Sequence, residues 1–252
     1  MQFQILMVGS SGILPYCSTL PVWQECGFSI AGSTADLNEA ISAVVRQDFD
    51  MLLCVNRPNA AVAASLLRRI RRRNKNIPVI VISQYDDSQD MRECFLLGAL
   101  DYLVEPVSER ALQAALERAG EVLSNKLINV NYLTALDRTL DRLPHTEQST
   151  PMLEKLREFL LSMQGRDVTA EAAADHFGFN RDYFGRYFKT RAGMTFRDFH
   201  RIFLMEYAGL LLTSGCYRVH EVSEILGFSS TDYFTRVFKK TTGMTPSEFR
   251  RS

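Results

Sequence analysis

The chain has 252 residues, of which 46% are hydrophobic and 23% are charged, proportions that are typical of a globular protein with real cores. This length allows two domains of roughly 100–200 residues each. The first residues lack the features of a secretory signal, and no apolar run approaches the ~18 residues of a membrane span. We therefore expect no membrane segment and a cytoplasmic location. The five cysteines show no Cys-x-x-Cys spacing, which favours reduced thiols over disulfides or a metal site.

The formal net charge is zero, but the charges are unevenly distributed. Residues 1–120 carry 11 Lys and Arg against 13 Asp and Glu, and residues 121–165 carry 5 against 6. Residues 166–252 carry 13 against 10 and form the only positive segment. A positive segment favours contact with a polyanion, and this modest excess indicates a phosphate-binding face there.

Residues 1–120 alternate apolar runs with amphipathic segments. We predict strands over Ile5–Val8, Ser29–Ala31, Met51–Val55, Ile77–Ile82 and Tyr102–Val104. We predict helices over Leu37–Val45, Ala61–Arg72 and Asp90–Leu97. Almost continuously apolar strands between helices are typical of a parallel sheet covered on both faces. The predicted fold is an α/β, doubly wound, five-stranded parallel sheet, with a crevice at the carboxyl ends of its first and third strands.

Residues 67–71, 80–87 and 97–107 resemble the receiver domain of bacterial response regulators. The resemblance implies a pocket in which two carboxylates hold Mg²⁺, an aspartate accepts a phosphoryl group and a lysine binds its oxygens. It also implies a Ser/Thr and Tyr/Phe pair that transmits the structural change caused by phosphorylation. A cis peptide bond between Glu105 and Pro106 is a further expectation from this resemblance.

Most of that chemistry is missing at the matching positions. Val55, or Asn56 one residue further on, matches the phosphoacceptor, and Glu105 replaces the lysine. Neither Val nor Asn supplies an anionic nucleophile, and Mg²⁺ has no carboxylate cluster to bind. The degenerate phosphorylation pocket has seven residues. Gly9 and Ser10 stand at the acidic pair, and Val55 or Asn56 stands at the phosphoacceptor. Ser83 and Tyr102 stand at the switch pair, and Glu105 stands at the lysine.

We therefore interpret residues 1–120 as a pseudo-receiver, with no catalytic residue, no metal and no cofactor. Its input would be an unknown regulatory protein or a small ligand instead of Asp phosphorylation. The alternative is a retained scaffold that carries no signal. The basic run Arg68–Arg73 is better explained as a solvated helix face than as a nucleic-acid patch.

Residues 121–150 are predicted to form a helical linker and hinge. After Ser108, apolar residues recur at near-heptad spacing, which fits either a dimer seam or helix packing within one chain. These positions are Leu112, Leu116, Ala119, Leu123, Lys126/Leu127, Val130 and Leu133. The stretch from Pro144 to Pro151 has the composition of a flexible hinge.

Residues 151–252 contain an internal repeat. Residues 177–189 recur as 226–239, and Gly193-Met194-Thr195 recurs 50 residues later as Gly243-Met244-Thr245. Each copy predicts a helix, a glycine turn and a second helix. In the first copy, a helix near Thr169–Phe177 ends at Gly178, and Asn180 caps the next helix. In the second copy, Ser229 or Ser230 is the expected cap.

The second helix of each copy carries an apolar stripe of helical period. The stripes are Tyr183, Phe184, Tyr187 and Phe188, and Tyr233, Phe234, Val237 and Phe238. Short polar and basic side chains on the opposite face suit a helix in the DNA major groove. The candidate DNA-binding residues are Arg181, Asp182, Arg186, Lys189, Thr231, Asp232, Thr235, Arg236 and Lys239.

Residues ~150–252 resemble the DNA-binding domain of the AraC/XylS family of bacterial regulators, most closely over 227–246. The resemblance implies an all-α domain of seven helices with two helix-turn-helix units, joined by a linker helix near Phe196–Thr213. It also implies that two recognition helices enter successive major grooves. Leu204 stands where relatives commonly carry Arg, and Gly185 stands at a base-facing position.

We expect a sequence-specific DNA-binding transcription regulator, an atypical response regulator that is not an enzyme. The expected partners are double-stranded promoter DNA and a second copy of the chain, bound through the receiver-like domain or the linker helix, with RNA polymerase as a further candidate. The alternative, which Gly185 and Leu204 favour, is an anti-activator that heterodimerises with another regulator and binds DNA weakly.

Overall fold

The computed structural model describes residues 2–9, 20–57, 62–73, 75–163 and 168–251. The chain divides into two compact units, Met1–Lys126 and Leu127–Ser252. Each unit has its own hydrophobic core.

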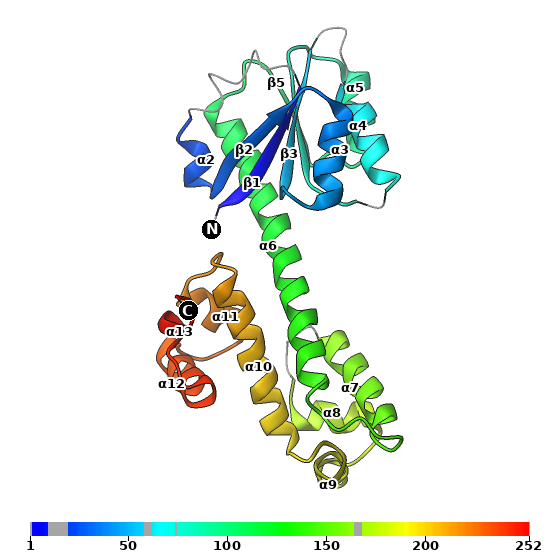
Figure 1. Cartoon of the computed structure of the whole chain (residues 1–252), viewed down its shortest axis with the longest axis vertical. Helices are drawn as coiled ribbons and strands as arrows, with labels where there is room; N and C mark the ends of the chain where they lie inside the picture. The colour runs from blue at the N-terminus through cyan, green and yellow to red at the C-terminus, as the bar shows by residue number, and fades with distance from the viewer. Residues whose placement is uncertain (1, 10–19, 58–61, 74, 164–167, 252) are drawn as a thin grey trace. The chain divides into compact units, whose positions relative to one another are not determined.

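The first unit is built on a five-stranded parallel sheet (Figure 1). Its strands are β1 (Phe3–Val8), β2 (Phe28–Thr34), β3 (Met51–Asn56), β4 (Val79–Ser83) and β5 (Asp101–Val104). They lie in the order β2-β1-β3-β4-β5, so the winding reverses between β1 and β3. The predicted doubly wound sheet is confirmed.

Helices cover both faces of this sheet because successive strand residues point to opposite sides. They are α2 (Val22–Glu25), α3 (Leu37–Arg46), α4 (Val62–Arg71), α5 (Ser88–Leu96) and α6 (Glu109–Leu140). Leu52 and Cys54 of β3 pack with α3, α4 and α5, whereas Met51, Leu53 and Val55 pack with α2 and the first half of α6. The predicted strands and helices lie within three residues of the observed ends; the short helix α2 was not predicted.

The basic run Arg68–Arg73, which extends past the end of α4, has two kinds of arginine. Arg72 and Arg73 are exposed, as expected of a solvated face. Arg71 is half-buried, and its guanidinium donates to the carbonyl oxygens of Lys75, Ile77 and Gly98 at 2.7–3.2 Å. Arg71 therefore links the segment that follows α4 to the segment that follows α5, which makes it a structural residue.

The near-heptad stretch of α6 packs within the chain over its first half. Leu112, Leu116, Ala119 and Leu123 are buried in the core of the first unit. A heptad pattern describes any helix that buries one stripe, so it could not separate this packing from a dimer seam. Only part of the predicted seam is free: Val130 is 50% exposed and Leu133 is 41% exposed.

A separate linker was expected over residues 121–150, whereas the two units meet directly after residue 126 in the sequence. Tyr132, Leu136 and Leu140 of α6, followed by Leu143, are buried in the core of the second unit. The second half of α6 is therefore a structural helix of that unit. The loop that follows ends at the buried Ser149, whose hydroxyl accepts from the Thr146 amide at 2.7 Å.

Seven helices follow α6 among the described residues of the second unit, the number that the resemblance implied. They are α7 (Thr150–Met163), α8 (Ala170–Phe177), α9 (Arg181–Ala192), α10 (Phe196–Thr213), α11 (Val219–Ile225), α12 (Thr231–Thr242) and α13 (Pro246–Phe249). The linker helix α10 has the predicted bounds, and it contacts α9, α11, α12 and α13.

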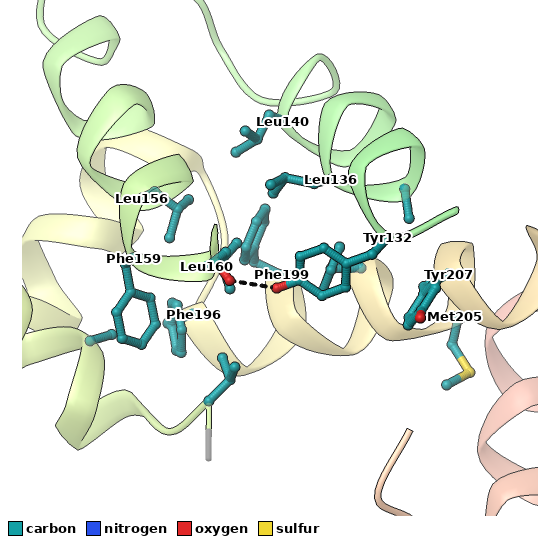
Figure 2. Close-up of a cluster of buried hydrophobic side chains, with 14 of the residues drawn as sticks. Tyr132, Leu136, Leu140, Leu156, Phe159, Leu160, Phe196, Phe199, Met205 and Tyr207 are labelled. Carbon is teal, nitrogen blue, oxygen red and sulfur yellow. Dashed lines mark hydrogen bonds between the residues drawn. The ribbon is translucent and has the colours of Figure 1, made fainter. Parts of the chain in front are cut away.

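Aromatic side chains fill the core around α10. The Tyr132 ring lies edge-on to Phe203 and Tyr207, with centroids 5.1 and 5.5 Å apart. Its hydroxyl donates to the Leu160 carbonyl oxygen at 2.7 Å (Figure 2). These contacts fix α6 and α7 against α10, the helix that joins the two repeats.

Candidate nucleic-acid interface and sheet-edge pocket

The second helix of each repeat begins in the same way. The Asn180 side chain accepts a hydrogen bond from the Tyr183 amide at 2.9 Å, and the Ser230 hydroxyl accepts one from the Tyr233 amide at 3.2 Å. Gly178, with φ of 72°, takes the left-handed conformation before the first cap, and Gly227, with φ of 73°, does so before the second. The predicted cap Asn180 is confirmed, and Ser230 rather than Ser229 caps α12.

The apolar stripes of α9 and α12 are narrower than predicted. Phe184, Phe188, Phe234 and Phe238 are fully buried, whereas Tyr183 and Tyr233 are each 47% exposed. Four-residue spacing puts each Phe pair on one helical face, while the preceding tyrosine is turned about 100° away from it. Tyr183 and Tyr233 therefore flank the polar face and are additional candidates for contact with DNA.

Most of the candidate DNA-binding side chains are open to solvent. Thr231 and Thr235 are half-buried, and the other seven are exposed. Arg181 forms an ion pair with Glu171 of α8 at 3.0 Å, so part of its positive charge is neutralised within the unit. Within the described residues, Arg186, Lys189, Arg236 and Lys239 make no salt bridge.

A first groove lies along α9 and is called the α9 groove here. Its volume is about 390 Å³, and it includes Arg186, Gly185 and Lys189 together with Arg197 from the start of α10. A Cβ atom added at Gly185 would meet nothing within 4 Å. The glycine therefore leaves open space on the exposed face of α9.

A second groove, the α10–α12 groove, lies between the linker helix α10 and the helix α12. Its volume is about 480 Å³, and its cations are Arg197 and Arg201 of α10 with Arg236 and Lys240 of α12. Sequence reasoning selected only Arg236 from this set. The four-residue spacing of Arg197 and Arg201 was the available signal, because it places two cations on one helical face.

The pocket of the first unit lacks space for an acidic side chain at its first position. A Cβ atom added at Gly9 would lie 2.7 Å from the Val55 carbonyl oxygen, and Gly9 has φ of 136°. Val55 itself is 3% exposed and belongs to the hydrophobic core. Ser10 lies outside the described residues.

The end of β3 carries a buried polar cluster that we call the Asn56 cluster, formed by Asn56, Asp90 and Tyr102. The Asn56 amide nitrogen and the Tyr102 hydroxyl both donate to Oδ2 of Asp90 at 2.8 Å. The Asn56 amide oxygen accepts from the backbone amides of Val62 and Ala63 at 3.0 and 2.9 Å. Burial raises the pKa of the Tyr102 phenol, so the phenol stays protonated and can donate.

The remaining predicted pocket residues make local contacts. The buried Ser83 hydroxyl donates to the Tyr85 carbonyl oxygen at 2.9 Å, and the Glu105 amide donates to the Ser83 carbonyl oxygen at 2.8 Å. The predicted cis peptide bond between Glu105 and Pro106 is confirmed. In the described part of the chain, no group of three His, Cys, Asp or Glu side chains is arranged to hold a metal ion.

Two family models match the chain. A response regulator receiver domain matches residues 21–117, and a helix-turn-helix domain matches residues 173–252. The chain therefore combines a response-regulator receiver domain with an AraC-type helix-turn-helix domain. No helix in the described ranges is long and apolar enough to cross a membrane.

Curated relatives match the chain to different extents. The transcriptional regulatory protein ZraR of Escherichia coli (strain K12) is 33% identical over 93 residues, which are 37% of this chain and 21% of ZraR. The chain thus spans about a fifth of that relative. The transcriptional regulatory protein HptR of Staphylococcus aureus (strain NCTC 8325) is 25% identical over 228 residues, 90% of this chain and 86% of HptR.

Among solved structures, the C-terminal domain of AraT, a response regulator from Geobacillus stearothermophilus, is 27% identical. The match covers 42% of this chain and 88% of that chain, with a TM-score of 0.38.

Proposed function

We propose that the chain is a sequence-specific transcription regulator that binds promoter DNA through α9 and α12. The observation that supports this proposal best is the repeated geometry of the two helices. Each has twelve residues, a side-chain cap, a preceding left-handed glycine and exposed cations on the face opposite its buried phenylalanines. Relatives that match 37% and 90% of the chain are named as transcriptional regulatory proteins.

The side chains on these faces have distinct roles in the proposal. Arg236 and Arg186 lie one turn into their helices, where a guanidinium can bond bidentately to guanine in the major groove. Lys189 and Lys239 lie near the helix ends and would bind phosphate oxygens. The phosphate contacts supply affinity and register, and the arginine contacts supply specificity.

We further propose that Asp phosphorylation does not control the first unit. Val55 is apolar, and the side chain of Asn56 is already bonded to Asp90 and to two backbone amides. At Gly9 an acidic side chain would collide with the Val55 carbonyl oxygen. A regulatory protein or a small ligand remains the proposed input.

A homodimer and a cytoplasmic location also remain proposals, as does the absence of enzymatic activity. Exposed apolar side chains support self-association: Leu96 of α5 is 78% exposed and Phe95 is 45% exposed. Val130 and Leu133 on α6 offer a second apolar surface.

The alternative function is an anti-activator that heterodimerises with another regulator and binds DNA weakly. Gly185 still favours it, because that position presents no side chain to a base. Leu204 favours it less than its sequence position suggested. Arg197 and Arg201 line the same groove as Leu204 and supply positive charge there.

Binding of the full chain to its own upstream DNA separates the two functions. We expect fluorescence anisotropy to show a lower Kd for that duplex than for a shuffled duplex of equal length and composition. Equal and weak binding to both duplexes would favour the anti-activator.

A further inference from the structure

The α10–α12 groove concentrates positive charge beyond what recognition of bases requires. Arg197, Arg201, Arg236 and Lys240 line it, with Leu204, Met205 and Val237 as apolar lining. Asp198 forms a salt bridge with Arg201 at 2.7 Å. In the described part of the chain the other three cations have no salt-bridge partner. A cleft lined by one sign of charge raises the local concentration of counter-ions, so an anion is the fitting occupant.

His200 also lines the same groove. Burial lowers the pKa of His200 to about 4, so the imidazole is neutral near pH 7. Its ring lies between Phe196 and Phe203, with centroids 6.2 and 6.4 Å away. Its buried Nε2 has no hydrogen-bond partner among the described residues. The positive charge of the groove therefore comes from its arginines and lysine and not from His200.

Arg197 connects this groove with the first recognition helix. It lines the α9 groove beside Arg186 and Lys189, and it also lines the α10–α12 groove beside Arg201 and Lys240. Cations therefore continue from α9 to α12 across the first half of α10. A single small anion would use few of them, whereas a chain of phosphates would use them in succession.

We propose that the α10–α12 groove binds phosphates of the DNA backbone that runs between the two major grooves entered by α9 and α12. Arg197, Arg201 and Lys240 bind phosphate oxygens there, while Arg236 at the same groove is left to read a base. The inference rests on the proposed DNA binding and extends it, because the linker helix becomes a source of affinity. Contacts of this kind are independent of sequence.

The test compares Arg197→Gln and Lys240→Gln with the wild-type full chain. Anisotropy titrations between about 50 and 200 mM salt are run on the upstream duplex and on its shuffled counterpart. We expect each variant to reduce the slope of log K against log salt by about one, and to weaken binding to both duplexes by the same factor. Arg197→Lys keeps the charge and is expected to keep the wild-type slope.

Arg157→Gln is the matched control. Arg157 is an exposed arginine of α7 that pairs with Asp137 and lies outside both grooves. We expect it to keep the wild-type slope, although it removes the same net charge. Wild-type slopes for Arg197→Gln and Lys240→Gln would overturn the inference while leaving the proposed function standing. A wild-type chain that shows no salt-dependent DNA binding would instead remove the proposed function itself.

A free phosphate-bearing ligand is the alternative occupant of the groove, because it offers the same anionic oxygens as the DNA backbone. Inorganic phosphate is added at constant ionic strength, and the thermal midpoint of the wild type is compared with those of the two variants. We expect no difference between them in response to phosphate. Stabilisation of the wild type alone, together with unchanged DNA slopes in the variants, would assign the groove to a free phosphate-bearing ligand and overturn the proposal.

Discussion

Asp90 is the residue that organises the Asn56 cluster, and pattern matching to receivers did not find it. The matching positions identified Asn56, Ser83 and Tyr102, because their spacing along the chain follows that of receivers. Asp90 is 8% exposed and lies on α5, which has no expected pocket residue. Its role depends on a fold that brings together residues 34 positions apart, so only the structure could show it.

Tyr102→Phe tests the Asn56 cluster. The change removes one of the two donors to Oδ2 of Asp90 and leaves the buried carboxyl with an unmet acceptor. We expect a loss of about 1–3 kcal/mol from the free energy of unfolding of the first unit. Urea unfolding followed by fluorescence of Trp23 measures it, because this single tryptophan is buried in that unit.

Tyr85→Phe is the control for that measurement. Tyr85 is half-buried, and within the described part of the chain its hydroxyl forms no hydrogen bond. We expect less than about 0.5 kcal/mol of change, as for most surface substitutions. Equal losses in the two variants would mean that the bond to Asp90 does not stabilise the unit.

At the scale of elements, the repeat was predictable and the burial within it only partly so. Glycines and capping residues gave the end of α8 and the position of Asn180, because these signals are local, whereas the bounds of the linker helix came from the resemblance to AraC/XylS regulators. The exposure of Tyr183 and Tyr233 was not predicted, since a four-residue aromatic stripe does not show which of its members face the core. Likewise, near-heptad spacing in α6 could not show that its partners lie in the same chain.

Ser230→Ala tests whether the cap of α12 holds the second recognition helix. The Tyr233 amide would lose its acceptor, and we expect a loss of about 1 kcal/mol in the stability of the second unit. Thermal unfolding followed by far-ultraviolet circular dichroism is the measurement. Ser229→Ala changes the exposed neighbour and should leave the midpoint unchanged; a larger shift for Ser229→Ala would contradict the assignment of the cap.

At the scale of the whole molecule, α6 supplies buried residues to both cores. Leu116 and Leu123 belong to the first, and Tyr132 and Leu136 belong to the second. The predicted boundaries of 120 and 150 differ from the division after residue 126, because no change in composition marks the point inside α6 where burial passes from one core to the other. A single continuous helix can cross from one core to another without any such change.

Acetyl phosphate tests the input proposed for the first unit. Incubation of the full chain with acetyl phosphate and Mg²⁺ should leave its mass and its Kd for upstream DNA unchanged, because neither Val55 nor Asn56 can accept the phosphoryl group. Beryllofluoride should have no effect for the same reason. A Mg²⁺-dependent aspartyl phosphate in the mass spectrum would contradict the pseudo-receiver interpretation.

The most direct test of the central claim is binding to a library of DNA sites at two salt concentrations. It compares the wild type with Arg186→Ala, Arg236→Ala and Lys239→Ala. Each arginine variant should lose about 1–3 kcal/mol and relax specificity at one base pair. The two affected positions should lie about one helical turn, ~10 base pairs, apart. Lys239→Ala should weaken binding to all sites alike and lower the salt slope by about one. Wild-type affinity and specificity in all three variants would contradict the account and make the repeat a structural bundle.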